Sequence, residues 1–141
     1  MTIVFRYREE ASEITGKILR PVASLEFKSL DGEWIEIRMY IDSGADITLI
    51  PLSFGRLLGL ELKKEDIKHL RGVGGGEVPV IVTNAEIRMN ELKFSICVAW
   101  ALEEDVPPLL GRSDLFDRFR IVFDQSKRVV IFEDNSKGSN E

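Results

Sequence analysis

The chain has 141 residues, of which 44% are hydrophobic and 30% are charged, a composition typical of one folded globular domain. Its net charge of -5 comes from 19 basic and 24 acidic residues spread along the sequence, without the basic stripe that a nucleic acid requires. No apolar run reaches the ~20 residues of a membrane helix, and the N-terminal sequence MTIVFRYREE turns charged before a signal-peptide core could form. We therefore expect a cytoplasmic domain that binds neither nucleic acid nor membrane.

Segments rich in β-branched and aromatic residues recur along the chain with turn residues between them, which predicts a mainly antiparallel β domain. The segments are residues 2–8, 21–29, 33–41, 79–89, 93–101, 120–125 and 128–132. Asp31-Gly32 predicts the tight turn of the first hairpin, because such a turn requires positive backbone angles. A second turn is expected near Met89-Asn90.

Helical patterns are short and occur at residues 51–60 and 113–119. Pro51 suits the first turn of one helix, and Ser113 could cap the other. The sole cysteine, Cys97, cannot form an intrachain disulfide, and its alternating apolar surroundings predict an inert buried thiol.

The most informative segment is residues 39–51, MYIDSGADITLIP, in which an apolar strand runs into Asp-Ser-Gly-Ala and then resumes. Gly44 allows the backbone to bend and another chain to approach, while the Ser43 hydroxyl can fix the loop by hydrogen bonding. The tripeptide alone is a weak signal, because Asp, Ser and Gly are ordinary turn residues. The apolar strands on both sides favour a positioned carboxylate over a plain surface turn.

Two further segments carry unusual patterns. Residues 69–82, HLRGVGGGEVPVIV, predict a glycine-rich hairpin tip that is either a floppy surface loop or a functional lid. They match no dinucleotide fingerprint, because Glu77 stands where a glycine is needed, and they lack the Gly-Lys of a phosphate loop. Residues 107–124, PPLLGRSDLFDRFRIVFD, place two leucines before Gly-Arg and a short helix.

Together these motifs, Asp-Ser-Gly-Ala-Asp, Gly-x-Gly-Gly and apolar-apolar-Gly-Arg, resemble in their order the retropepsin-like aspartic proteases, which are the retroviral enzymes and their cellular relatives. The resemblance covers roughly residues 35–132. It implies a single-domain, mainly β fold, half of an acid protease, with a closed β-barrel, a glycine-rich flap hairpin and one or two short helices. We expect this domain at residues 31–133, after an N-terminal part of uncertain role at 1–30 and before a polar tail at 134–141.

The resemblance also implies roles for individual residues. Asp42 matches the catalytic aspartate, and Ser43, Gly44 and Ala45 match the loop that supports it. The residues that would bind substrate are Asp46, Ile47, Leu70, Arg71, Gly72, Val73, Gly74, Val106, Pro107 and Leu109. Arg112 matches an arginine that braces Asp46, and we expect the Asp46 carboxylate in this ion pair to be partly buried. Arg71 and Ser113 depart from the usual family residues, and the resemblance implies neither a metal nor a cofactor.

The chemistry of such a site needs two aspartates. Two carboxylates about 3 Å apart cannot both be ionised, so one deprotonates a water while the other donates a proton to the peptide carbonyl, as in aspartic proteases generally. The chain holds no second Asp-Ser/Thr-Gly, so a homodimer with two Asp42 residues on its two-fold axis is expected. It would hydrolyse a peptide or unfolded protein bound as an extended strand.

Three alternatives use the same residues. Asp-x-Gly after a strand also resembles the first phosphate loop of the actin and sugar-kinase superfamily, but those folds need two large lobes. A catalytically silent dimer that binds peptides or acts as a scaffold stays open. Serine chemistry is poorly supported, because His69 is the only histidine and is expected on the surface.

Overall fold

The computed structural model describes residues 1–72 and 75–135 and is mainly β. Its strands are β1 Thr2–Arg6, β2 Arg8–Ser12, β3 Gly16–Arg20, β4 Val22–Lys28, β5 Trp34–Ile41, β6 Thr48–Ile50, β7 Lys68–Arg71, β8 Glu77–Met89, β9 Leu92–Ala101, β10 Leu109–Leu110, β11 Phe119–Asp124 and β12 Val129–Asp134. Its helices are α1 Leu52–Leu57 and α2 Leu115–Arg118, with a 3-10 turn at Lys64–Asp66.

Six strands close into a barrel. The order β4-β5-β10-β6-β9-β8 is completed by pairing of β4 with β8, and β7 extends the sheet beyond β8. Side chains alternate across the wall as a barrel requires, so Ile37 and Met39 are buried while Arg38 between them is exposed. The mainly β fold with a closed barrel, predicted from the motifs, is confirmed.

A second sheet of three strands, in the order β1-β12-β11, joins the two ends of the chain. Phe132 on β12 lies edge-on to Phe5 and to Phe119, with ring centroids 5.5 Å apart in both pairs. These contacts belong to the same hydrophobic core as the barrel. Residues 1–30 therefore supply β1 to this sheet and β4 to the barrel.

The two predicted hairpin turns are present. Gly32 has a φ of 92° in the turn between β4 and β5, and Asn90 has a φ of 53° in the turn between β8 and β9. The predicted strand at residues 2–8 is wrong in extent, because it is divided at Tyr7, whose N–H donates to the Arg128 carbonyl oxygen at 3.0 Å. Beyond it lies the β2–β3 hairpin, which we did not predict.

Both helices are shorter than their predicted ranges. Pro51 precedes α1 rather than lying in its first turn, and Asp114, not the predicted Ser113, precedes α2. Helix α1 packs tightly on the barrel, because a Cβ at Gly55 would lie 2.0 Å from Trp100 Nε1. That same Nε1–H donates to the Leu52 carbonyl oxygen at 3.1 Å and fixes the helix on β9.

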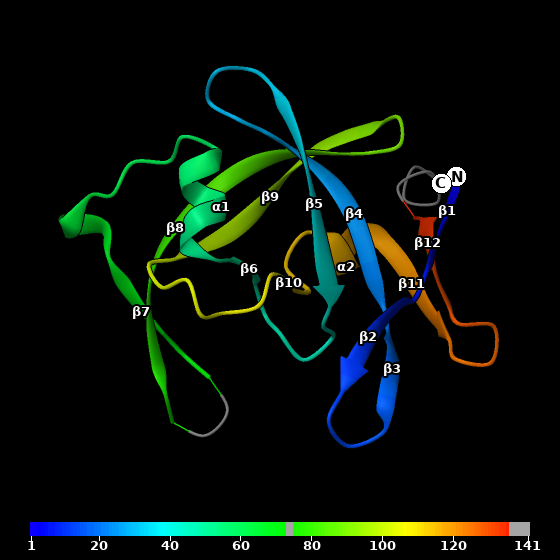
Figure 1. The fold of residues 1–141 in the computed structure, drawn as a ribbon. Helices are drawn as coiled ribbons and strands as arrows, with labels where there is room; N and C mark the ends of the chain where they lie inside the picture. The colour runs from blue at the N-terminus through cyan, green and yellow to red at the C-terminus, as the bar shows by residue number, and fades with distance from the viewer. Residues whose placement is uncertain (73–74, 136–141) are drawn as a thin grey trace.

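In Figure 1 the β7–β8 hairpin and the β2–β3 hairpin project towards the lower edge of the view, and the arrow of β5 points the same way. The two hairpins therefore project on the side of the molecule where β5 ends.

Among the helices of the described residues, none is long and apolar enough to cross a membrane. His69 is exposed on β7, as predicted. Cys97 on β9 was expected to be buried, but it is only half-buried.

Candidate active site

Asp42 follows the last residue of β5, at the start of a loop of residues 42–47 that we call the Asp42 loop. The strand before it is held by β10, which pairs with β5 in parallel. The Asp42 N–H donates to the Leu110 carbonyl oxygen at 3.0 Å, and its Oδ1 accepts the Gly44 N–H at 2.9 Å. Asp42 is half-buried, and its carboxylate is oriented by a backbone N–H of its own loop.

The Asp42 loop turns sharply. The Ala45 N–H donates to the Asp42 carbonyl oxygen at 3.2 Å, and Ser43 and Gly44 between them are exposed. A Cβ at Gly44 would lie 3.2 Å from Asp42 Oδ1, closer than most such contacts, so glycine suits this approach to the carboxylate. Two exposed residues beside the carboxylate leave the loop accessible to another chain.

A buried hydroxyl joins the start of β6, directly after the Asp42 loop, to the residue that follows β10. Thr48 is fully buried, and its Oγ1 accepts the Gly111 N–H at 3.1 Å. A Cβ at Gly111 would lie 2.4 Å from the carbonyl carbon and oxygen of Ile47, so only glycine fits there without movement. We missed Thr48 in the sequence, where the one signal was a polar residue inside the apolar run ITLI.

Arg112 and Asp46 form the expected ion pair, with Arg112 Nη2 donating to Asp46 Oδ1. The backbone holds the same two segments together, since the Arg112 N–H donates to the Ala45 carbonyl oxygen and the Ser113 N–H to that of Asp46, both at 2.9 Å. Our expectation of a partly buried carboxylate is wrong, because the Asp46 side chain is 86% exposed and that of Arg112 is 52% exposed. The backbone hydrogen bonds hold the two segments close together, whereas the two charged side chains extend into solvent.

A pocket of about 420 Å³ opens beside Asp42. It is lined by Glu10, Arg20, Pro21, Tyr40, Ile41, Asp42, Pro107 and Leu109. Pro107 and Leu109 were predicted to bind substrate, whereas Glu10, Arg20 and Tyr40 were not. The lining combines apolar side chains with charged ones, which is typical of sites that bind an amphipathic ligand.

Glu10 attaches the β2–β3 hairpin to the end of β5. Its Oε2 accepts the Tyr40 hydroxyl at 2.6 Å, and its Oε1 lies 3.2 Å from Arg20 Nε. The hydrogen bond to Glu10, together with burial, raises the pKa of Tyr40 above its ordinary value. The hairpin is thus fixed at one wall of the pocket.

The predicted glycine-rich hairpin is formed by β7 and β8, which pair from Lys68 with Val80 to Arg71 with Glu77. The Gly72 N–H donates to the Gly76 carbonyl oxygen at 3.0 Å. Arg71 Nε lies 3.3 Å from Glu77 Oε1, so the arginine pairs within its own hairpin. Val73 and Gly74, both predicted to bind substrate, lie outside the described residues.

Several other predicted residues meet in one apolar cluster. Its buried members are Leu49, Val80, Ala99 and Ala101, and Ile47, Leu70, Val106 and Leu109 pack against them. The cluster connects the Asp42 loop, the β7–β8 hairpin and the segment before β10. Val106 contributes to this cluster and does not line the pocket beside Asp42.

The mainly β fold with its closed barrel is retropepsin-like, and the solved structures that share it include two proteases. The protease of EIAV complexed with the inhibitor HBY-793 is 22% identical, with a TM-score of 0.54 over 70% of this chain and 86% of that one. A retropepsin-like aspartic protease from Rickettsia conorii is 20% identical, with a TM-score of 0.55 over 91% of this chain and 95% of that one.

The family is shown by the sequence itself. The aspartyl protease family matches residues 29–113, which is more than half of the chain, so the chain belongs to that family. A comparison with curated proteins finds no match. The resemblance inferred from the three motifs is thereby confirmed at the level of the family.

Proposed function

We propose that the chain is one subunit of a homodimeric aspartic endopeptidase, in which the Asp42 carboxylates of two copies activate a water between them. The observation that carries the proposal is the Asp42 carboxylate itself, which directly follows β5, accepts the Gly44 N–H at 2.9 Å and borders a pocket of about 420 Å³. Membership of the aspartyl protease family supports it.

The chemistry follows from two carboxylates that share one proton. The ionised carboxylate takes a proton from the water while the water oxygen attacks the peptide carbonyl carbon. The protonated carboxyl donates its proton to the carbonyl oxygen. The Gly44 N–H would hold Asp42 in one orientation before substrate binds, so little reorganisation is needed in the transition state. The tetrahedral intermediate then collapses with proton transfer to the leaving amine.

The second carboxylate would come from a second copy of the chain. The sequence offers one Asp-Ser-Gly, and Ser43 and Gly44 are exposed next to Asp42, so a two-fold axis can pass beside the loop. In this dimer Ser43 would contact its counterpart. Ala45 and Asp46 would lie on the floor of the cleft, and Arg112 would brace Asp46 from behind.

The substrate would lie as an extended strand between the floor and the β7–β8 hairpin, which would act as the flap. Leu70, Ile47 and Val106 support this placement, because they already meet in one apolar cluster. Pro107 and Leu109 would receive an apolar side chain in the pocket beside Asp42. Arg71 and Gly72 would complete the flap over the peptide.

The test is hydrolysis of an unfolded protein by the wild-type chain, by Asp42→Asn and by a Glu91→Gln control, which likewise replaces a carboxylate by an amide. Glu91 is an exposed residue in the turn between β8 and β9, so its change should leave hydrolysis unaltered. We expect Asp42→Asn to abolish cleavage while the fold is kept, and a statine-type inhibitor to block the wild type. Cleavage by a clean Asp42→Asn preparation contradicts the mechanism, and a wild type that binds unfolded protein without cutting it indicates the silent scaffold.

A further inference from the structure

The strand β8 has an unpaired edge in the middle of the barrel wall. On one side it pairs with β9 from Val80 to Met89. On the other side it pairs with β7 only up to Val80 and with β4 only at Ile87 and Arg88. Between these pairings, residues 81–86 have no second partner strand in the part of the chain that the structure describes.

The unpaired edge presents backbone groups at a regular spacing. In an antiparallel ladder, alternate residues direct both their N–H and C=O groups away from the partner strand, here β9. These groups require another partner, which is either water or another backbone. Exposed edges are commonly protected by proline or a bulge, but residues 81–86 read IVTNAE, with β-branched side chains and no proline.

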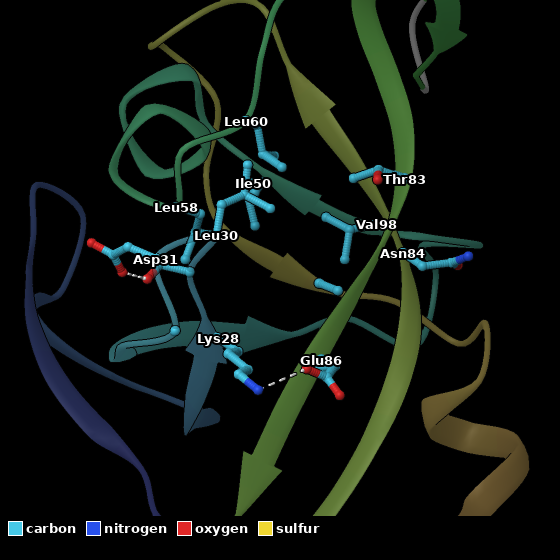
Figure 2. A pocket seen from close by; sticks show the side chains of 13 residues that line it. Lys28, Leu30, Asp31, Ile50, Leu58, Leu60, Thr83, Asn84, Glu86 and Val98 are labelled. Atoms are coloured by element: carbon cyan, nitrogen blue, oxygen red, sulfur yellow. Dashed lines mark hydrogen bonds and ion pairs between the residues drawn. The ribbon is translucent and has the colours of Figure 1, made fainter.

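A pocket of about 480 Å³ lies beside this edge, and Figure 2 shows the side chains that line it. A second pocket of about 310 Å³ shares Leu30, Leu60 and Thr83 with the first, and we call the two pockets together the groove. Its floor includes the buried side chains of Leu58 and Val98, so the groove offers apolar contacts next to the open backbone groups. Leu30, at the mouth, is 73% exposed and is the most exposed apolar residue of the groove.

The rim of the groove carries more negative than positive charge. Four carboxylates, those of Asp31, Glu61, Asp66 and Glu86, line it against two lysines. At one end of the groove, Glu86 Oε2 lies 3.5 Å from Nζ of one of these lysines, Lys28. Glu61 and Asp66 at the other end have no ion-pair partner among the described residues. A ligand with positive charge complements this rim.

We propose that residues 81–86 of β8 bind an extended, basic segment of a partner polypeptide, which adds a strand to the barrel wall. Backbone hydrogen bonds to the open edge supply the affinity, as in other cases of strand addition. Alternate apolar side chains of the segment enter the groove, and lysine or arginine side chains between them approach Glu61 and Asp66. This site is separate from the pocket beside Asp42, because the two share no lining residue.

The probe is a blocked synthetic peptide of alternating lysine and valine, long enough to pair with about six residues. It is added to the full chain carrying Asp42→Asn, so that the probe persists whether or not the proposed activity is correct. Binding is followed by titration calorimetry, and the site by amide exchange and amide chemical shifts. We expect saturation below about 1 mM, with slower exchange at alternate residues of 81–86.

Two control peptides test the recognition. In the first, N-methylation of alternate residues removes backbone hydrogen-bond donors of the peptide and should weaken binding about tenfold or more. In the second, glutamate replaces lysine, which reverses the charge of the peptide and should weaken binding by a similar factor. Equal binding of the N-methylated peptide overturns strand addition, and so do amide changes confined to the Asp42 loop and β7. No binding at about 1 mM also overturns the proposal.

A pair of variants adds a test within the protein. Leu30→Arg fills the mouth of the groove with a basic side chain, whereas Leu57→Arg makes the same change at an exposed leucine of α1 outside the groove. We expect Leu30→Arg to weaken binding about tenfold and Leu57→Arg to leave it unchanged. Equal binding by both variants contradicts the assigned groove. The N-methylated peptide keeps the proposal testable if Leu30→Arg does not fold.

Discussion

Replacing Gly111 by alanine tests the contact between the Asp42 loop and β10. The new Cβ would lie 2.4 Å from the carbonyl carbon and oxygen of Ile47 and 2.8 Å from its nitrogen. These atoms are backbone, so no side-chain rotation can relieve the overlap, and the two segments must separate. The shift would also stretch the hydrogen bond from the Gly111 N–H to the buried Thr48 hydroxyl. Overpacking of this kind costs about 3 kcal/mol.

The assay is urea unfolding at one fixed protein concentration, followed by tryptophan fluorescence, because Trp100 is buried in the core. Gly76→Ala is the matched control, since a Cβ there would meet nothing within 4 Å. We expect Gly111→Ala to lower the free energy of unfolding by about 3 kcal/mol and Gly76→Ala to change it by less than about 0.5 kcal/mol. Equal stabilities of the two variants would refute the proposed close contact.

Three further changes probe the site. Arg112→Ala should cost no more than about 1 kcal/mol of unfolding free energy, because its pair with Asp46 is exposed; a larger loss would mean that the dimer buries the pair. Ala45→Ser should move the acidic limb of kcat/KM to lower pH, because the added hydroxyl can donate to the ionised catalytic carboxylate, and an unmoved limb would exclude that contact. The hydrogen bond from Tyr40 to Glu10 raises the pKa of the Tyr40 phenol above its ordinary 10.0. The stability that this hydrogen bond contributes is therefore fully present below pH 10.0 and is lost as the pH rises through the raised pKa of the folded protein. Tyr40→Phe should therefore flatten the alkaline fall of unfolding free energy, and an unchanged slope would contradict this link.

The barrel strands could be predicted because their sequences carry the pattern that burial imposes. Ile37 and Met39 alternate with polar residues, and Asp31-Gly32 supplies the turn. The β2–β3 hairpin, residues 8–20, could not be predicted in this way, because most of its side chains are exposed and show no apolar period. Its position depends on the contact of Glu10 with Tyr40, thirty residues away in the sequence.

The site shows the same division. The motifs located the Asp42 loop and the pairing of Asp46 with Arg112, because each residue type is tied to a short local pattern. The role of Thr48 depends on where the end of β10 passes, which no local pattern records. The exposure of the Asp46 carboxylate was also missed, because only the three-dimensional arrangement shows which side of the pair faces solvent.

The central claim is that one active site needs the Asp42 carboxylates of two chains, and a mixing experiment tests it most directly. Wild-type and Asp42→Asn chains are unfolded together, refolded at constant total concentration and assayed on one fluorogenic peptide. If both carboxylates are needed, activity follows the square of the wild-type fraction, so an equal mixture retains about one quarter of the wild-type rate. Retention of about one half would show that each chain acts alone and would contradict the shared site.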